Sequence, residues 1–353
     1  MRKLLIMLLA VCSMTVGAQE KEKEKKPFTI NLPQWVKDIK LSGYGMLQYQ
    51  GKDQEDAHEN TFQLRLARLS LDGKVGQFQW KVQMQINGNT STLGASPRLI
   101  DLWAEWQPRD YFRVKAGEFK RPFTLENPMH PITQGFMSYS QPISKLAGMS
   151  DRTGEHPSNG RDIGVQIQGD FLKNAAGRNL LHYQVGVFNG EGINTKDADN
   201  RKDIIGGLWV MPIEGMRIGV FGWTGSSVIN GVSTPKNRYA LSADYVTASD
   251  WTFRTEYIHS QGYGANAAAG DKADGFYALC IAPVIANKLH VKARYDLYRD
   301  RKDWDTSKTF YEIGADYVFN KYVQLNIEYA RVNDRSLEKH GYNMVDVELD
   351  FKF

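Results

Sequence analysis

The sequence ends on Tyr342-Asn-Met-Val-Asp-Val-Glu-Leu-Asp-Phe-Lys-Phe353, and the alternation in this stretch decides the fold. From Val345 onward every second residue is apolar, and each residue between is charged. Successive side chains of a strand point to opposite faces, so this segment is a strand with one apolar and one charged face. Such a strand fits a soluble sheet as well as a membrane barrel, and the rest of the chain has to decide between them.

The same alternation recurs along almost the whole chain. Sixteen strands are predicted, over residues 39–50, 61–72, 77–87, 98–107, 111–119, 160–171, 180–189, 203–213, 216–225, 237–248, 251–261, 274–286, 288–300, 307–319, 321–333 and 342–353. The number is even, as in bacterial single-chain barrels. The lengths are close to the ~9–11 residues that a tilted spanning strand needs.

The connections between these strands are alternately long and short. Long connections fall near 51–60, 88–97, 120–159, 190–202, 226–236, 262–273, 301–306 and 334–341. Outer-membrane barrels show this asymmetry, with short periplasmic turns and longer external loops. The mean hydropathy of −0.47 is compatible with a barrel, because lumen residues alternate with lipid-facing ones. We therefore predict an all-β fold, a transmembrane antiparallel β-barrel of about 16 strands. A large soluble β-sandwich or propeller is the alternative.

The start of the chain predicts export. Residues 1–18 have a charged start, a short apolar run and a small-residue cleavage site, which is the pattern of a signal peptide. Residues 19–38 contain a charge run and are predicted as a periplasmic leader, so the barrel itself covers 39–353. Cys12 leaves with the signal peptide, and Cys280 then has no cysteine partner within the chain. The predicted location is the bacterial outer membrane.

One connection, residues 120–159, is far longer than the others and carries aromatic residues such as Phe123, Phe136 and Tyr139. Long ordered loops in compact proteins usually have a function. We expect this third external loop to fold into the lumen and to narrow it. An external cap or a subunit contact is the alternative.

Three separated blocks carry a family resemblance: LRLARLSLDGKVGQFQWKVQ (64–83), RVKAGEFKRPFTLE (113–126) and NGRDIGVQIQGDF (159–171). Together they resemble the phosphate-selective porin O and P family. The resemblance implies a homotrimeric outer-membrane porin of 16 strands in contact with outer-membrane lipid, with the third loop as its constriction. It also implies passage of anions such as phosphate, and recognition of the terminal Phe353 by the barrel assembly machinery.

The alternation also predicts which side chains line the pore. If apolar residues face lipid, the side chains of Arg65, Lys81, Arg113 and Lys115 point into the lumen, and Lys120 and Arg121 open the long loop. Rings of Arg or Lys in a narrow pore select anions, because their N–H groups replace the lost water. These six residues are therefore the candidate anion contacts.

The alternative interpretation is that these cations are ordinary lumen residues paired with acids. The later strands point acidic residues inward by the same rule, which predicts an acidic wall beside the basic one. These acids are Glu312, Asp316, Glu328, Asp346, Glu348 and Asp350. Arg68 is a separate case. Strict alternation from Phe62 places it in lipid, whereas a β-bulge near Ala67 would turn it inward and let Leu69 and Leu71 face out.

Other classes of function have weaker support. An outer-membrane enzyme would need a nucleophile beside a base. The candidate histidines are the loop residues His58, His130, His156 and His340. The chain contains no G-x-S-x-G, H-E-x-x-H or paired cysteine motif. A sugar-conducting pore would need an aromatic track, for which Trp103 is a single candidate. A non-conducting plugged barrel or adhesin is the third alternative. No catalytic residue, cofactor, metal site or nucleic-acid partner is predicted.

Overall fold

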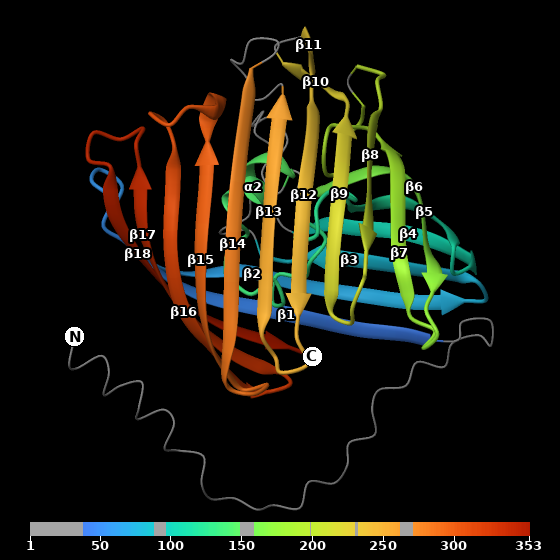
Figure 1. The fold of residues 1–353 in the computed structure, drawn as a ribbon, viewed down its shortest axis with the longest axis horizontal. Coiled ribbons are helices and arrows are strands. Elements are labelled where there is room, and N and C mark those ends of the chain that lie inside the picture. Colours follow the sequence, from blue (N-terminus) through green and yellow to red (C-terminus); the bar gives the residue numbers. More distant parts are fainter. Residues whose placement is uncertain (1–37, 88–96, 149–158, 198, 230–231, 262–270) are drawn as a thin grey trace, which may run out of the picture. The chain divides into compact units, whose positions relative to one another are not determined.

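The computed structural model describes residues 38–87, 97–148, 159–197, 199–229, 232–261 and 271–353, and sixteen of their strands close into one antiparallel barrel (Figure 1). The barrel strands are β1 (Asp38–Lys52), β2 (Glu59–Val75), β3 (Phe78–Gln85), β4 (Arg98–Arg109), β5 (Phe112–Lys120), β6 (Arg161–Lys173), β7 (Asn179–Phe188), β8 (Asp203–Val210), β9 (Met216–Thr224), β12 (Asn237–Val246), β13 (Thr252–Gln261), β14 (Lys272–Ile285), β15 (Leu289–Arg299), β16 (Lys308–Asn320), β17 (Val323–Asp334) and β18 (Gly341–Lys352). Each strand pairs with its neighbours in the chain, and β18 pairs with β1. The predicted barrel of 16 strands is confirmed.

Three small elements of the described part of the chain lie outside the barrel ladder. They are the hairpin of β10 (Ser226–Ile229) and β11 (Val232–Pro235), the helix α2 (Gln141–Leu146) and the 3-10 turn η1 (Asp300–Lys302). None of the three was predicted, since each is too short to show a period in the sequence. Among the described residues, no helix is long and apolar enough to cross a membrane. The predicted signal peptide and most of the leader lie outside the described residues.

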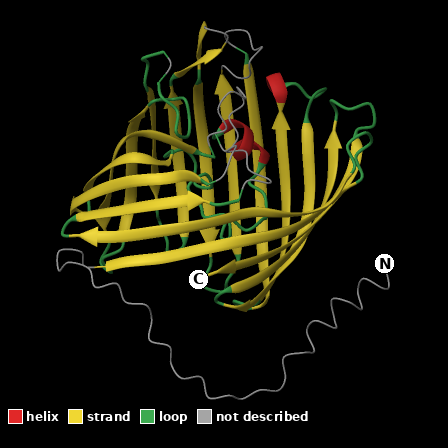
Figure 2. Ribbon diagram, turned by 180° about the vertical axis from the view of Figure 1, so that it is seen from behind, coloured by secondary structure: helices red, strands yellow, loops and turns green. Residues whose placement is uncertain are grey.

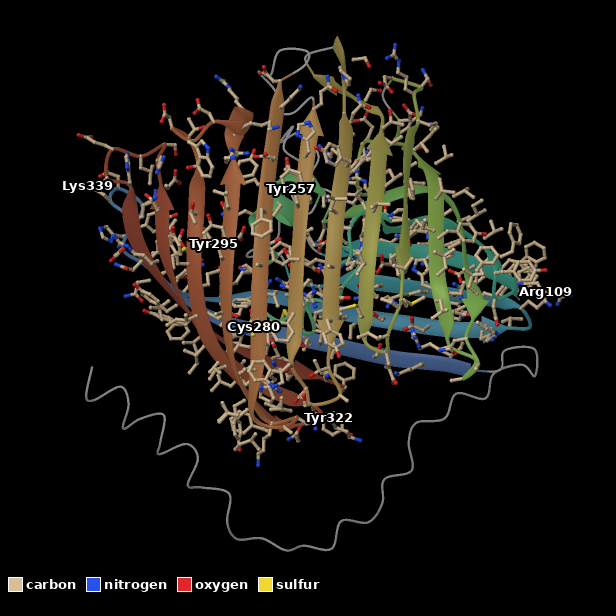
Figure 3. All side chains as sticks on the ribbon, in the orientation of Figure 1. Arg109, Tyr257, Cys280, Tyr295, Tyr322 and Lys339 are labelled. Atoms are coloured by element: carbon tan, nitrogen blue, oxygen red, sulfur yellow. The ribbon has the colours of Figure 1, made fainter. Side chains whose placement is uncertain are left out.

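The outer face of the barrel is apolar, as the alternation predicts for a lipid-facing surface. Phe62 exposes 75% of its surface there, and Leu41, Val220 and Ile313 are exposed in the same way. The two ends differ as the sequence predicted, since only residues 110–111 separate β4 from β5 whereas 121–160 separate β5 from β6. Figure 3 shows Lys339 at the end with the long loops and Tyr322 at the end with short turns.

A β-bulge in β2 sets which of its side chains face the lumen. The register between β1 and β2 shifts by one residue, so Arg65 has no partner of its own in β1. The side chain of Asn87 holds the bulge, because its amide donates to the carbonyls of Leu64 and Arg65 and accepts from the N–H of Ala67. Of the two positions left open for Arg68, the structure has the inward one, with the bulge two residues earlier than Ala67.

The last strand closes the barrel against the first. Phe353 exchanges two backbone hydrogen bonds with Gly43, at 3.0 and 3.2 Å. The rings of Phe353 and Phe351 lie over Gly43 and Gly45, where an added Cβ would be 2.5 and 2.3 Å from the ring carbons. Glycine is needed at these two positions because the aromatic side chains of β18 occupy the space. The aromatic end of the sequence thus covers the seam.

Candidate functional site

The long loop lies inside the barrel, against inward-facing side chains of β13–β17. The backbone N–H groups of Leu125 and Glu126 donate to the carboxylate of Glu256, at 2.9 Å each. The N–H of Met137 donates to Glu328, also at 2.9 Å. Figure 2 shows the helix α2 of this loop within the ring of strands. The acids of these strands thus serve as acceptors for the loop backbone.

Cations of the same wall bind the carbonyl groups of the loop. Arg254 donates to the carbonyl of Gln134 at 2.7 Å, Lys292 to that of Gly135 at 2.9 Å, and Arg294 to that of Ser138 at 2.9 Å. A buried loop must have its backbone polar groups paired, because an unpaired group loses its hydrogen bonds to water. The wall therefore supplies both donors and acceptors for the loop.

Apolar packing completes the attachment of the loop. Phe123 is fully buried, and its ring centroid lies 5.5 Å from that of Trp223 and 6.4 Å from that of Phe221. Leu125 and Phe136 belong to the same buried cluster, and so do Ile143 and Leu146 of α2. This cluster fills the lumen between the loop and the wall that it packs against.

The acids that the sequence places on the lumen side of the later strands include several that pair with basic side chains in the structure, as the alternative interpretation expects. Glu328 accepts from the loop and from Lys292, and Glu312 pairs with Arg294. Glu348 pairs with Arg65 at 3.1 Å. The loop could not be placed from strand alternation alone, and it is the loop backbone that binds Glu328 of β17.

The open side of the loop bounds a cavity of about 300 Å³. Its lining combines six cations with a single carboxylate: Arg68, Lys81, Lys115, Lys120, Arg121, Arg161 and Asp101. Aromatic and amide side chains complete the wall, and Pro128, Met129, His130 and Pro131 form the loop side. The lining has a net charge of +5 when His130 is neutral, from six positive charges and one negative.

Two of these cations have only neutral hydrogen-bond partners among the described residues. Arg68 donates to the hydroxyl of Tyr44 at 2.9 Å and to the amide oxygen of Gln85 at 3.1 Å. Lys120 donates to the carbonyl of Met129 at 2.6 Å and to the hydroxyl of Tyr139 at 2.9 Å. Their positive charges are therefore not cancelled by an adjacent carboxylate.

Lys81 and Lys115 have longer contacts to acids and stay accessible. The ammonium of Lys81 is 3.5 Å from Asp72, and that of Lys115 is 3.8 Å from Glu105. Their side chains are 25% and 18% exposed. Lys115 also lies over the ring of Trp103, 4.1 Å from its centroid, in a cation–π contact.

The structure separates the six predicted anion contacts into two groups. Lys81, Lys115, Lys120 and Arg121 line the cavity together, whereas Arg65 and Arg113 lie outside it. Arg65 pairs with Glu348, and Arg113 pairs with Asp170 at 2.6 Å. Arg121 is fully buried, pairs with Asp162 at 2.9 Å and stacks near Trp223. The contact of each of the six with a passing anion stays a prediction.

Two further cavity residues were not among the predicted contacts. Arg161 donates to both carboxylate oxygens of Asp101, at 2.8 and 3.0 Å, from the far end of the long loop. The ring of His130 lies 4.5 Å from that of Tyr44. Burial, with Lys120 and Arg68 nearby, lowers the pKa of His130 to about 4, so it is neutral at pH 7. The sequence marked His130 only as a loop histidine, and the position of the loop is needed to place it at the cavity. Within the described residues, no cluster of His, Cys, Asp or Glu could hold a metal ion.

Residues 42–200 match the family described as phosphate-selective porin O and P. The match spans the barrel from β1 to the loop before β8, so this part of the chain is similar to that family. The resemblance predicted from the sequence is confirmed, and the barrel is an outer-membrane porin of a bacterium, a channel by family and fold. No curated protein matches the porin at a significant level.

Solved structures share the fold of the porin over most of its length. The anion-selective porin from Comamonas acidovorans superposes with a TM-score of 0.68 at 13% identity, over 90% of this chain and 99% of that one. OmpF of Salmonella typhi, in complex with daunomycin, gives 0.65 at 12% identity, over 89% and 97%. OmpT of Vibrio cholerae in its trimer form gives 0.61 at 12% identity, over 90% and 99%.

Proposed function

We propose that this porin lets small anions diffuse passively across the outer membrane and that the cavity beside the loop selects them. The observation that carries the proposal is the lining of the cavity, with six cations against one carboxylate. The family name and the anion-selective porin of similar fold support it. Phosphate is the anion that the family name suggests.

The cavity can replace the water that an anion loses on entry. Arg68 and Lys120 are bound only to neutral groups, and Lys81 is only partly engaged by Asp72. An anion about 4 Å from one such charge gains roughly 1 kcal/mol in bulk water and roughly 4 kcal/mol near a protein surface. Several moderate contacts attract the anion, but together they do not enclose it. The anion can therefore leave fast enough for conduction.

The other predicted cations have a different proposed role. Arg121 fixes the start of the loop through its buried pair with Asp162, and Arg65 and Arg113 are held by carboxylates of neighbouring strands. We infer that these three shape the lumen and its potential, whereas Lys81, Lys115 and Lys120 contact the anion together with Arg68 and Arg161.

The experiment is the reversal potential of the refolded porin in a planar bilayer under a salt gradient. The wild type should be anion-selective, and the Lys81→Gln, Lys115→Gln double variant should lose most of this selectivity. The matched control is the double variant Lys173→Gln, Lys339→Gln, which removes two exposed rim charges that pair with Asp110 and Glu55. An equal change in both double variants would place the selectivity outside the cavity.

We propose that the porin conducts solutes and does not catalyse a reaction. The cavity lining contains no Ser, Thr or Cys that could act as a nucleophile beside His130. Hydrolysis of a phosphate ester by the folded porin, lost in His130→Ala, would contradict this assignment.

The assembly of the porin is proposed to follow its relatives. OmpT, a barrel of similar fold, has a trimer form, which supports a homotrimer here. Phe353 is exposed at the end of the closing strand, which supports its recognition by the barrel assembly machinery. Deletion of Phe353 should reduce the amount of folded, heat-modifiable porin in the outer membrane, and cross-linking of the native membrane should give a trimer.

A further inference from the structure

The lumen wall of β3–β7 carries a row of amide side chains that anion selection does not require. They are Gln79, Gln83, Gln107, Gln166, Gln168 and Gln184. These residues lie on β3, β4, β6 and β7, and Lys81 and Lys115 lie on β3 and β5 of the same wall. Gln83, Gln166, Gln168 and Gln184 line the same cavity as the cations. Amides are neutral and offer both donors and acceptors, which suits hydroxyl groups.

Glu105 orients this row of amides. One carboxylate oxygen accepts from Gln107 at 2.7 Å, and the other accepts from Gln168 at 2.8 Å. A carboxylate only accepts, so both glutamines must turn their NH₂ groups toward it. The oxygen of Gln168 then accepts from Gln166 at 2.7 Å. Donors and acceptors along this wall are therefore fixed in direction.

The last amide in this series of hydrogen bonds has an acceptor without a partner. The amide oxygen of Gln166 is buried and has no partner in the described part of the chain, while the residue lines the cavity. Leaving a buried acceptor unpaired is costly, so the site favours a molecule that brings a donor. Inorganic phosphate fills little of a cavity of about 300 Å³, which has room for about ten water-sized volumes.

Apolar surfaces also line the cavity. The rings of Trp103, Tyr44 and Phe119 line the cavity, and Met129 closes it from the loop. A sugar ring has hydroxyl groups at its edge and C–H groups on its faces, so it can meet amides and apolar side chains at once. A phosphate or sulfate group on such a ring would reach the cations.

We propose that the cavity binds a polyhydroxylated organic anion of the sugar phosphate class in preference to inorganic phosphate. Arg68, Lys81 and Lys120 hold the anionic group, and the hydroxyl groups bind the amides of Gln166 and Gln184. This inference rests on the proposed anion selectivity and adds the class of solute.

The test compares block of the chloride current by glucose 6-phosphate, inorganic phosphate and glucose. It uses the folded wild-type porin in a planar bilayer at mildly alkaline pH, where both phosphates are dianions. Glucose 6-phosphate should give half-block at a concentration about fivefold lower than phosphate or better, as expected for added hydroxyl–amide hydrogen bonds. Glucose alone should block far more weakly. Equal block by both phosphates, or by glucose and glucose 6-phosphate, would overturn the inference.

Variants connect the preference to the amides. In the double variant Gln166→Met, Gln184→Met, glucose 6-phosphate and phosphate should give half-block at about the same concentration, while block by phosphate is unchanged. The control Gln63→Met removes an amide that bonds Gln48 outside the cavity and should keep the preference. If the double variant does not fold, each single variant is measured instead, and an unchanged preference in both contradicts the assignment. A cation-selective wild type would instead refute the proposed function. Failure of the anion selectivity and failure of the sugar phosphate preference therefore give different results.

Discussion

Replacing Glu256 by alanine should release the first half of the loop from the barrel wall. Glu256 is a buried residue of β13, and its carboxylate accepts from the N–H groups of Leu125 and Glu126. It also accepts from the hydroxyls of Tyr277 and Ser242. Alanine removes all four contacts and puts nothing in their place.

The magnitude follows from the two backbone donors that lose their acceptor. A buried donor left unpaired costs about 1–3 kcal/mol, so two of them cost about 2–6 kcal/mol. Loss of the charge on Glu256 also relieves its repulsion with Glu126, which offsets part of this cost. A net loss of about 2 kcal/mol would raise the population of the released loop roughly 30-fold, because about 1.4 kcal/mol corresponds to a factor of ten.

Hydrogen exchange followed by mass spectrometry on the folded porin is the assay. Peptides that cover residues 123–137 should exchange about 30-fold faster in Glu256→Ala, and the single-channel current should become noisier. The matched control is Glu348→Ala, which removes a buried carboxylate that pairs with Arg65 and makes no contact with the loop among the described hydrogen bonds. Equal protection of residues 123–137 in the two variants would refute the reasoning.

Three further predictions concern other parts of the porin. Burial raises the pKa of Glu191 to about 7, so the packing of its loop should weaken as the pH rises from about 4.5 to 7. Hydrogen exchange of residues 189–197 should therefore become faster over this pH range in the wild type. The variant Glu191→Gln should lose this pH dependence. Gly45→Val should lower the yield of folded barrel on gels, because its side chain would meet Phe351, and the added variant Phe351→Ala should restore part of it. Arg121→Met leaves the buried carboxylate of Asp162 without its guanidinium partner, so the porin should lose about 3–5 kcal/mol and melt at a lower temperature in a heat-modifiability assay. Lys120→Met should not have this effect.

Strand alternation predicted the barrel well because lipid imposes a strict rule. Every strand has to be apolar on its outer face, and every backbone group has to be paired in the ladder. The rule also extended to Arg68, whose position required a bulge that the sequence suggested. The same reasoning placed Lys81 and Lys115 in the lumen, where the structure has them.

Alternation could not predict what the lumen contains. The helix α2 and the position of His130 follow from packing of the long loop against strands far away in the sequence. Glu256 is 130 residues away from Glu126, and no local pattern indicates that the two meet. For the same reason alternation could not show that Glu328, one of the inward-facing acids, accepts a hydrogen bond from the loop.

The sequence by itself determined that this chain forms a 16-stranded barrel with a lipid-facing and a polar face, because side-chain alternation and backbone pairing are local properties of each strand. The tertiary structure decided which charges remain available. The loop binds the acids of β13–β17 and leaves Arg68, Lys81, Lys115 and Lys120 around an open cavity. The physical reason is that a buried loop backbone needs hydrogen-bond partners. The charged residues of the wall that serve as these partners are no longer available to a solute in the pore.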